Sequence, residues 1–139
     1  MRIEASRELL AARPDVWAVL AEPYHLADWW PGISGVHPDR RGAAAGARWR
    51  VIGLDRPTLL RRPRAESTLV VRAADPPSLF AFHLSAERLD VTIRLEATAP
   101  DRTLATLAVE GPLLFGDRRA LPRRAAQRLY DLCQTAASL

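Results

Sequence analysis

Lysine and asparagine are absent from this chain of 139 residues, and all 20 of its basic residues are arginines. Together with abundant alanine and proline, this bias indicates a GC-rich coding sequence rather than a surface selected for nucleic acid. The formal net charge of +4 is modest, and the arginine pairs at 40–41, 61–62, 118–119 and 123–124 are scattered among acids. They lack the interleaved aromatic residues of a single-strand binding platform, so we expect no nucleic-acid partner.

Cysteine occurs once, at Cys133, which excludes an internal disulfide and any zinc cluster built from the cysteines of this chain. His25 and His37 have neither the i,i+4 spacing nor a carboxylate partner typical of a metal site. We therefore predict no metal and no other cofactor.

Long apolar runs are also absent. No segment approaches the roughly 18 residues that a membrane-spanning helix needs, and the charged N-terminal residues 1–8 interrupt the apolar core of a signal peptide. With 48% hydrophobic and 26% charged residues, the sequence is typical of one globular domain covering residues 1–139. We expect a cytoplasmic protein without membrane insertion.

Residues 2–11 alternate well enough to predict a first strand, and two short helices follow it. Pro14 suits the first turn of a helix, and Pro23 should end that helix. A second short helix carries Leu26, Trp29 and Trp30 and ends at Pro31-Gly32. Of the two adjacent tryptophans, we expect one in the core and the other at the rim of a cavity.

The periodicity then changes to that of strands with one apolar face. The clearest example is 89–97, and a last strand is expected at roughly 103–111. The segment 54–64 is predicted to be a loop or an irregular edge. The C-terminus returns to helical spacing, and because Pro122 removes a backbone hydrogen bond, we predict either a kink there or a new helix start.

The order is therefore strand, two short helices, about six antiparallel strands and a long C-terminal helix, an α+β arrangement. With Pro-x-Val-Trp-x-x-Leu at 14–20, Pro23 and Trp29-Trp30-Pro31-Gly32, the chain resembles the START-like or SRPBCC superfamily of helix-grip folds. That superfamily includes polyketide cyclases and dehydrases and lipid-transfer domains. The resemblance implies a curved sheet around the C-terminal helix, with an apolar cavity between them.

Side-chain volumes support such a cavity, because one helix is too narrow to cover a strongly curved sheet. Ala125, Cys133 and Ala136 leave space on the helix, while large aromatic residues line the strands. The alternative is a closely packed core in which these small residues let the helix approach the sheet. The predicted lining comprises Trp30, Trp49, Phe80, Phe82, Val91, Phe115, Leu129, Tyr130 and Cys133.

The first hypothesis for function is a protein that holds a small apolar ligand, polyketide-like or lipid-like, in this cavity. The second is a cyclase, aromatase or dehydratase, for which Tyr130 and His83 are weak catalytic candidates. His83 faces solvent if Phe80 and Phe82 face inward, and it becomes the best general base if the phase is reversed. The ring of Tyr130 either offers its hydroxyl to the pocket or packs at a strand edge with its hydroxyl in water.

A third hypothesis is an interaction protein that docks through its arginines. It requires one patch formed by Arg61, Arg62, Arg64, Arg118, Arg119, Arg123 and Arg124. The lone thiol of Cys133 is interpreted as an inert core residue, because no base is positioned beside it in the sequence pattern.

Overall fold

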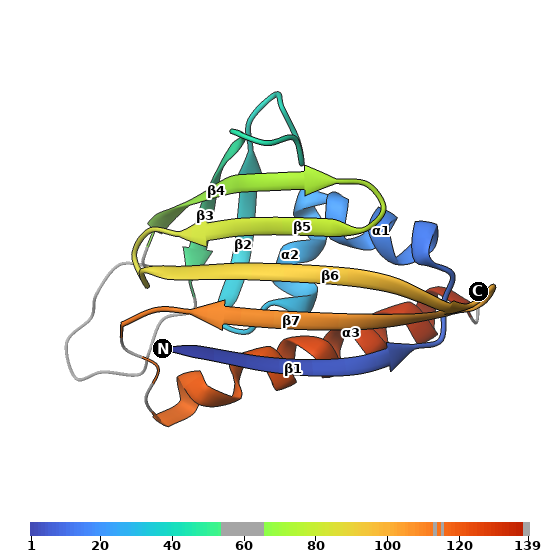
Figure 1. The fold of residues 1–139 in the computed structure, drawn as a ribbon. Coiled ribbons are helices and arrows are strands. Elements are labelled where there is room, and N and C mark those ends of the chain that lie inside the picture. The colour runs from blue at the N-terminus through green and yellow to red at the C-terminus, as the bar shows by residue number, and fades with distance from the viewer. Residues whose placement is uncertain (54–65, 113, 115, 138–139) are drawn as a thin grey trace.

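The computed structural model describes residues 1–53, 66–112, 114 and 116–137 of the chain. Within these ranges, seven strands form a single antiparallel sheet in the order β1-β7-β6-β5-β4-β3-β2 (Figure 1). The strands are β1 (Arg2–Leu9), β2 (Ile33–Pro38), β3 (Arg48–Gly53), β4 (Glu66–Asp75), β5 (Leu79–Leu84), β6 (Leu89–Ala99) and β7 (Arg102–Glu110). The predicted loop at 54–64 lies outside the described residues.

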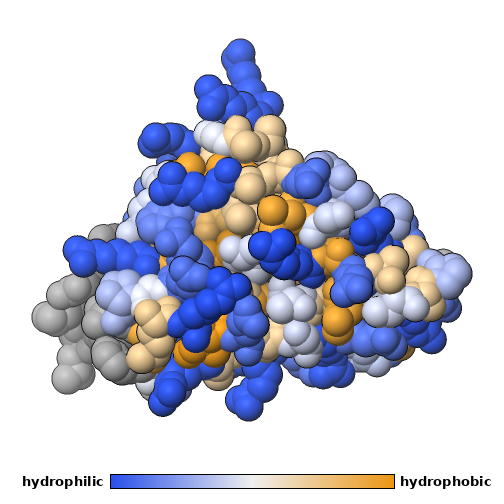
Figure 2. Space-filling model, in the orientation of Figure 1, coloured by the Kyte–Doolittle hydropathy of each residue, from blue (hydrophilic) through white to orange (hydrophobic). Residues whose placement is uncertain are grey.

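Alternating side chains give the sheet one dry and one wet face, as the sequence predicts, and hydrophilic side chains are prominent on the face of the molecule that Figure 2 shows. In β6, Leu89, Val91 and Ile93 are buried, whereas Asp90 and Arg94 between and beside them are exposed. The first strand is shorter than predicted and ends at Leu9, because the chain bends there to enter the first helix. β1 pairs with β7 along its whole length, so the first and last strands lie side by side.

The helices of the described chain all lie on one face of the sheet (Figure 1). They are α1 (Arg13–Ala21), the 3-10 turn η1 (Pro23–His25) and α2 (Leu26–Trp29), followed at the other end of the chain by the turn η2 (Gly116–Ala120) and the long helix α3 (Leu121–Ala137). Pro14 stands in the first turn of α1, and Pro23 begins η1, where the carboxylate of Glu22 accepts the backbone N–H of Tyr24 at 3.3 Å. Prolines thus set the helix boundaries that the sequence predicts.

The C-terminal helix resolves the alternative left open at Pro122. Gly116–Ala120 form a separate 3-10 turn, and α3 begins at Leu121, so Pro122 occupies the first helical turn, where its missing N–H costs no hydrogen bond. A new start therefore replaces a kink.

The principal contacts of α3 are with β1, β7 and α2. α1 contacts β6 and β7, while α2 and η1 contact β2. The long helix therefore covers the β1–β7 side of the sheet. Over β3 and β5, the apolar space is filled by large side chains, several of which come from α1 and α2.

Candidate functional site

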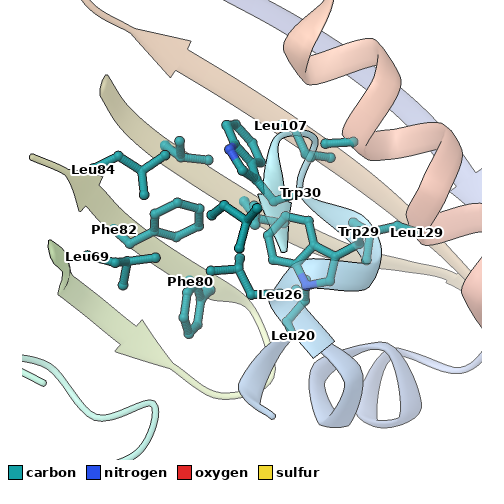
Figure 3. Packing of buried hydrophobic residues seen from close by; sticks show 14 of the residues in the cluster. Leu20, Leu26, Trp29, Trp30, Leu69, Phe80, Phe82, Leu84, Leu107 and Leu129 are labelled. Atoms are coloured by element: carbon teal, nitrogen blue, oxygen red, sulfur yellow. The ribbon is translucent and has the colours of Figure 1, made fainter. Parts of the chain in front are cut away.

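Six aromatic side chains meet between the sheet and the short helices, and we call them the aromatic cluster: Trp17, Trp29, Trp30, Trp49, Phe80 and Phe82. The centroids of Phe80 and Phe82 lie 5.8 Å apart, and those of Trp30 and Phe82 are also 5.8 Å apart. Most of these pairs meet edge to face, the arrangement that brings the positive edge of one ring to the negative face of another. Figure 3 shows Trp29 and Trp30 projecting from α2 toward Phe82 on the sheet.

Local structure explains how distant residues reach the cluster. Phe80 and Phe82 are two residues apart in β5 and therefore share its inner face. Trp49 projects from β3, and its ring centroid lies 6.1 Å from that of Phe80. Trp29 ends α2 and Trp30 follows it as the C-terminal cap residue, so the two rings meet at an interplanar angle of 86°.

Eight of the nine residues predicted to line the cavity fall within the described chain. Seven of these are no more than 2% exposed and belong to the apolar core: Trp30, Trp49, Phe80, Phe82, Val91, Leu129 and Cys133. Val91 pairs with Phe82 across β5 and β6. Phe115 lies outside the described residues. The fold thus brings the strand-borne and helix-borne lining residues into one core cluster.

Two details differ from the sequence-based expectation. Trp29 and Trp30 are 1% and 2% exposed, so burial does not separate a core ring from a rim ring. Trp17 also belongs to the aromatic cluster, with its centroid 6.0 Å from that of Phe80. The helical spacing of Trp17 and Leu20 predicted that both lie on the buried face of the first helix. It did not predict which strand that face would contact.

The indole nitrogens of the cluster are in unequal environments. Trp49 Nε1 donates a hydrogen bond of 2.6 Å to the carbonyl oxygen of Gly42. Trp29 Nε1 is buried and has no hydrogen-bond partner within the described part of the chain. An unpaired buried donor costs about 1–3 kcal/mol of stability, so this N–H is held without compensation from the protein.

Neither weak catalytic candidate is directed toward the aromatic cluster. His83 lies on the opposite face of β5 from Phe82, and its Nδ1 is 2.8 Å from a carboxylate oxygen of Asp90 on the neighbouring strand. Tyr130 is half-buried, and its hydroxyl accepts a hydrogen bond of 3.2 Å from the exposed Gln134. The phase that would make His83 a general base in the interior is therefore not the one that the strand adopts.

Arg7 faces inward from β1, although its charge predicts an exposed position. It shares the α3-facing side of β1 with Ala5 and Leu9, and its guanidinium lies 4.1 Å from the centroid of the Tyr130 ring. Its Nη1 donates a hydrogen bond of 2.6 Å to Gln127 Oε1 on α3. The alternation that assigned Ala5 and Leu9 to the inner face placed Arg7 there as well. Arg7 thus ties β1 to α3 by a cation–π contact and a hydrogen bond.

Cys133 lies on the buried face of α3. Burial raises the pKa of its thiol to about 11, and the negative charge of Asp15 adds to the rise. At neutral pH the group is therefore a protonated thiol and a poor nucleophile. This agrees with its interpretation as a core residue.

The remaining polar candidates lie at the surface. His25 Nδ1 is 3.2 Å from the Asp28 carboxylate, and both side chains are exposed, as is His37. In the part of the chain that the structure describes, no three histidine, cysteine or acidic side chains are grouped to hold a metal. No helix among those residues is long and apolar enough to cross a membrane.

The arginine patch can be followed only at its C-terminal half. Arg119, Arg123 and Arg124 are exposed on η2 and α3, and Arg118 is half-buried. Arg61, Arg62 and Arg64 lie outside the described residues, so their convergence with these four stays a prediction.

Residues 1–134 match the family model described as polyketide cyclase / dehydrase and lipid transport. The chain belongs to this family. The match spans β1 through most of α3, so the family's sequence pattern coincides with the whole fold described above. No curated protein gives a significant sequence match to the chain.

Solved structures confirm the helix-grip fold of this family member. The di-domain ARO/CYC BexL from the BE-7585A biosynthetic pathway matches all of this chain with 48% of its own length, at a TM-score of 0.75 and 16% identity. A START superfamily protein from Mycobacterium smegmatis matches 97% of this chain with 98% of its own, at a TM-score of 0.71 and 12% identity. A protein from Nitrosomonas europaea matches 100% of this chain with 97% of its own, at a TM-score of 0.71 and 17% identity. At these identities the likeness concerns the fold alone.

Proposed function

We propose that this polyketide cyclase/dehydrase-family protein binds a small apolar molecule, polyketide-like or lipid-like, between its sheet and α3, against the aromatic cluster. The supporting observation is the position of that cluster. Six rings gather over β3 and β5, whereas the principal contacts of α3 are with β1, β7 and α2. Flat aromatic surfaces beside a single long helix form the kind of wall that apolar ligands contact.

Apolar burial supplies enough free energy for such binding. A ligand that buries roughly 300 Å² of apolar surface gains about 7 kcal/mol at about 25 cal/mol per Å², before the cost of immobilising it. Binding of this kind needs no charged side chain in the aromatic cluster. Leu129 and Cys133 on α3 and Val91 on β6 would complete the apolar surroundings of the ligand.

The scarcity of polar side chains in the described core favours ligand binding over acid–base catalysis. Thr103 is the one buried polar residue among those that the structure describes, and its hydroxyl already donates to the carbonyl oxygen of Ala11 at 2.8 Å. A cyclase or dehydratase mechanism needs two titratable groups within reach of one substrate. The Cys133 thiol, with its raised pKa, is a poor candidate for either role.

The test begins with native mass spectrometry of freshly purified protein, followed by the same sample under denaturing conditions. We expect a bound apolar passenger of a few hundred daltons that is lost on denaturation, and its mass would identify its chemical class. In parallel, the protein would be stripped of any passenger and titrated with the apolar dye N-phenyl-1-naphthylamine, whose fluorescence rises in apolar surroundings.

A matched pair of variants locates the site. Leu129→Trp adds a bulky ring on the buried face of α3 and should weaken dye binding about 10-fold or more. Arg128→Trp adds the same ring at the neighbouring exposed position and should leave dye binding unchanged. Absence of both passenger and dye binding would contradict the proposal, whereas loss of one water mass from a bound precursor would favour the dehydratase alternative.

A further inference from the structure

The N–H of Trp29 has no acceptor among the residues that the structure describes, and the residue is only 1% exposed. Figure 3 shows the Trp29 indole among apolar side chains, with Leu20 and Leu26 nearest its nitrogen in this view. Leucine side chains offer no acceptor, which fits the lack of a partner for this donor.

The same cluster shows that the fold can pair an indole N–H. Trp49 is as deeply buried as Trp29, and its Nε1 reaches the carbonyl oxygen of Gly42 at 2.6 Å. The contrast is therefore a property of the Trp29 position and not of buried tryptophans in this core. Buried donors are nearly always paired in native proteins, so an exception needs an explanation, and an acceptor supplied by a bound molecule is one.

We propose that Trp29 Nε1 is the polar contact of the ligand site and donates a hydrogen bond to a carbonyl oxygen on an otherwise apolar ligand. This inference rests on the proposed function, because it requires the ligand to reach the aromatic cluster. It adds the chemical class of the ligand: an apolar carbonyl compound in preference to a pure hydrocarbon. If the ligand lacks a carbonyl oxygen, Trp29 Nε1 stays unpaired in the complex. The site should therefore bind a carbonyl compound more tightly than a hydrocarbon of the same shape.

The neighbours of Trp29 suit such a ligand. Trp30 and Phe82 contact it edge to face, with centroids 6.0 and 6.2 Å away, and both present apolar ring surface. A planar carbonyl compound could pack against these rings while its oxygen accepts the N–H. No charge is required, and a neutral carbonyl costs far less free energy to move out of water than an ionised acceptor does.

The test uses 9-fluorenone and fluorene, two tricyclic probes of nearly the same shape that differ in one carbonyl oxygen. Dissociation constants would be measured for both probes by titration calorimetry, on the wild type and on Trp29→Phe and Trp49→Phe. We expect the wild type to bind fluorenone about 10-fold more tightly than fluorene, a ratio typical of one neutral hydrogen bond. Trp29→Phe should reduce that ratio to about one, and Trp49→Phe should keep it, whatever either substitution does to the affinity of both probes.

A second readout does not depend on the variants folding well. In a ¹⁵N-labelled wild-type sample, each indole N–H gives its own resonance, and that of Trp29 can be assigned from nuclear Overhauser effects to its neighbouring side chains. Fluorenone should move the Trp29 N–H proton downfield, as hydrogen bonding does, and fluorene should not.

The outcomes separate this inference from the proposed function. Equal binding of the two probes to the wild type, without a fluorenone-specific shift at Trp29, would overturn the inference and leave apolar binding supported. Discrimination that persists in Trp29→Phe would assign the donor elsewhere and also overturn it. Binding of neither probe, with no passenger and no dye binding, would overturn both.

Discussion

Cys133 combines small volume with deep burial at the face of α3 that meets the core. Burial changes the pKa of this thiol between the folded and the unfolded chain. The pKa is about 11 in the folded protein and has a usual value of 9.0 in an exposed chain, because burial disfavours the thiolate. The folded state therefore retains the proton at a pH where the unfolded state has lost it.

Stability should consequently fall as the pH rises from about 9 to about 11, the window between the two pKa values. In this window the unfolded state binds fewer protons, so each rise in pH favours unfolding. We expect wild-type protein to lose about 2 kcal/mol more than Cys133→Ala across the window. Urea denaturation of both proteins at several pH values measures the difference, and parallel curves for the two proteins would disprove the assignment.

Individual inward-facing residues were predictable where strand alternation was regular. Phe80, Phe82 and Val91 are buried as their phase required. Arg7 also follows the alternation of β1, although its charge predicts an exposed position. Its contact with the Tyr130 ring stabilises the guanidinium on the inner face. The missing acceptor at Trp29 could not be predicted, because it depends on what surrounds a nitrogen in three dimensions.

At the scale of elements, β7 ends where the chain passes close to the turn before β6. A Cβ atom added at Gly111 would lie 2.8 Å from Leu89 Cδ2 and 2.9 Å from the carbonyl oxygen of Arg88. Glycine is therefore needed at this position for a close approach of two backbones. A side chain would force the β5–β6 turn away from the end of β7.

Gly111→Ala should destabilise the protein by about 1–3 kcal/mol, the usual cost of forcing atoms into a packed contact. Gly35→Ala is the matched control, since its Cβ would lie 3.6 Å from the nearest atom, an ordinary van der Waals distance. We expect the control to change stability by less than about 1 kcal/mol. Thermal unfolding of both variants tests this, and similar melting temperatures for the two would show that the turn yields easily.

Element boundaries were predictable mainly where proline determines them. Pro14, Pro23 and Pro122 each stand in the first turn of a helical segment, which follows from their fixed φ and missing N–H. The separate turn at Gly116–Ala120 was not predicted, because its residues continue a helix-like pattern. The end of β1 at Leu9 is set by its backbone pairing with β7, which stops at Thr103, and not by the side-chain pattern.

For the whole molecule, the order of the strands in the sheet determines which backbone amides are protected from exchange with solvent. β7 is paired on both sides, with β1 and β6, and its inner residues are fully buried. β2 lies at the end of the strand order, pairs with β3, and has an irregular register between Ile33 and Gly35. Opening β7 requires disruption of the core, whereas β2 can separate at the edge.

Hydrogen exchange followed by mass spectrometry should therefore show the slowest amide exchange in β7 and β6 and the fastest strand exchange in β2. We expect the protection factors to differ by at least about 100-fold, because local opening costs less than global unfolding. Equal exchange in β2 and β7 would indicate that the sheet opens only as one unit.

The sequence of elements along the chain and the helix-grip architecture were predictable from periodicity and from the family resemblance, and the family match and the solved structures confirm that architecture. The order of the strands within the sheet was not predicted. The gathering of the aromatic cluster was only partly predictable. Trp17 and Trp29 come from helices whose orientation over β5 is set by tertiary packing, which a one-dimensional pattern does not contain.

The pairing of β1 with β7 also has a consequence for synthesis on the ribosome. Arg2 emerges among the first residues, yet its partner Glu110 is made more than a hundred residues later. Until then, the initial segment has no neighbour to complete the sheet, and α3, which packs on both strands, is still to be made. Nascent chains should therefore stay incompletely folded, and dependent on chaperone protection, until the final helix has left the exit tunnel.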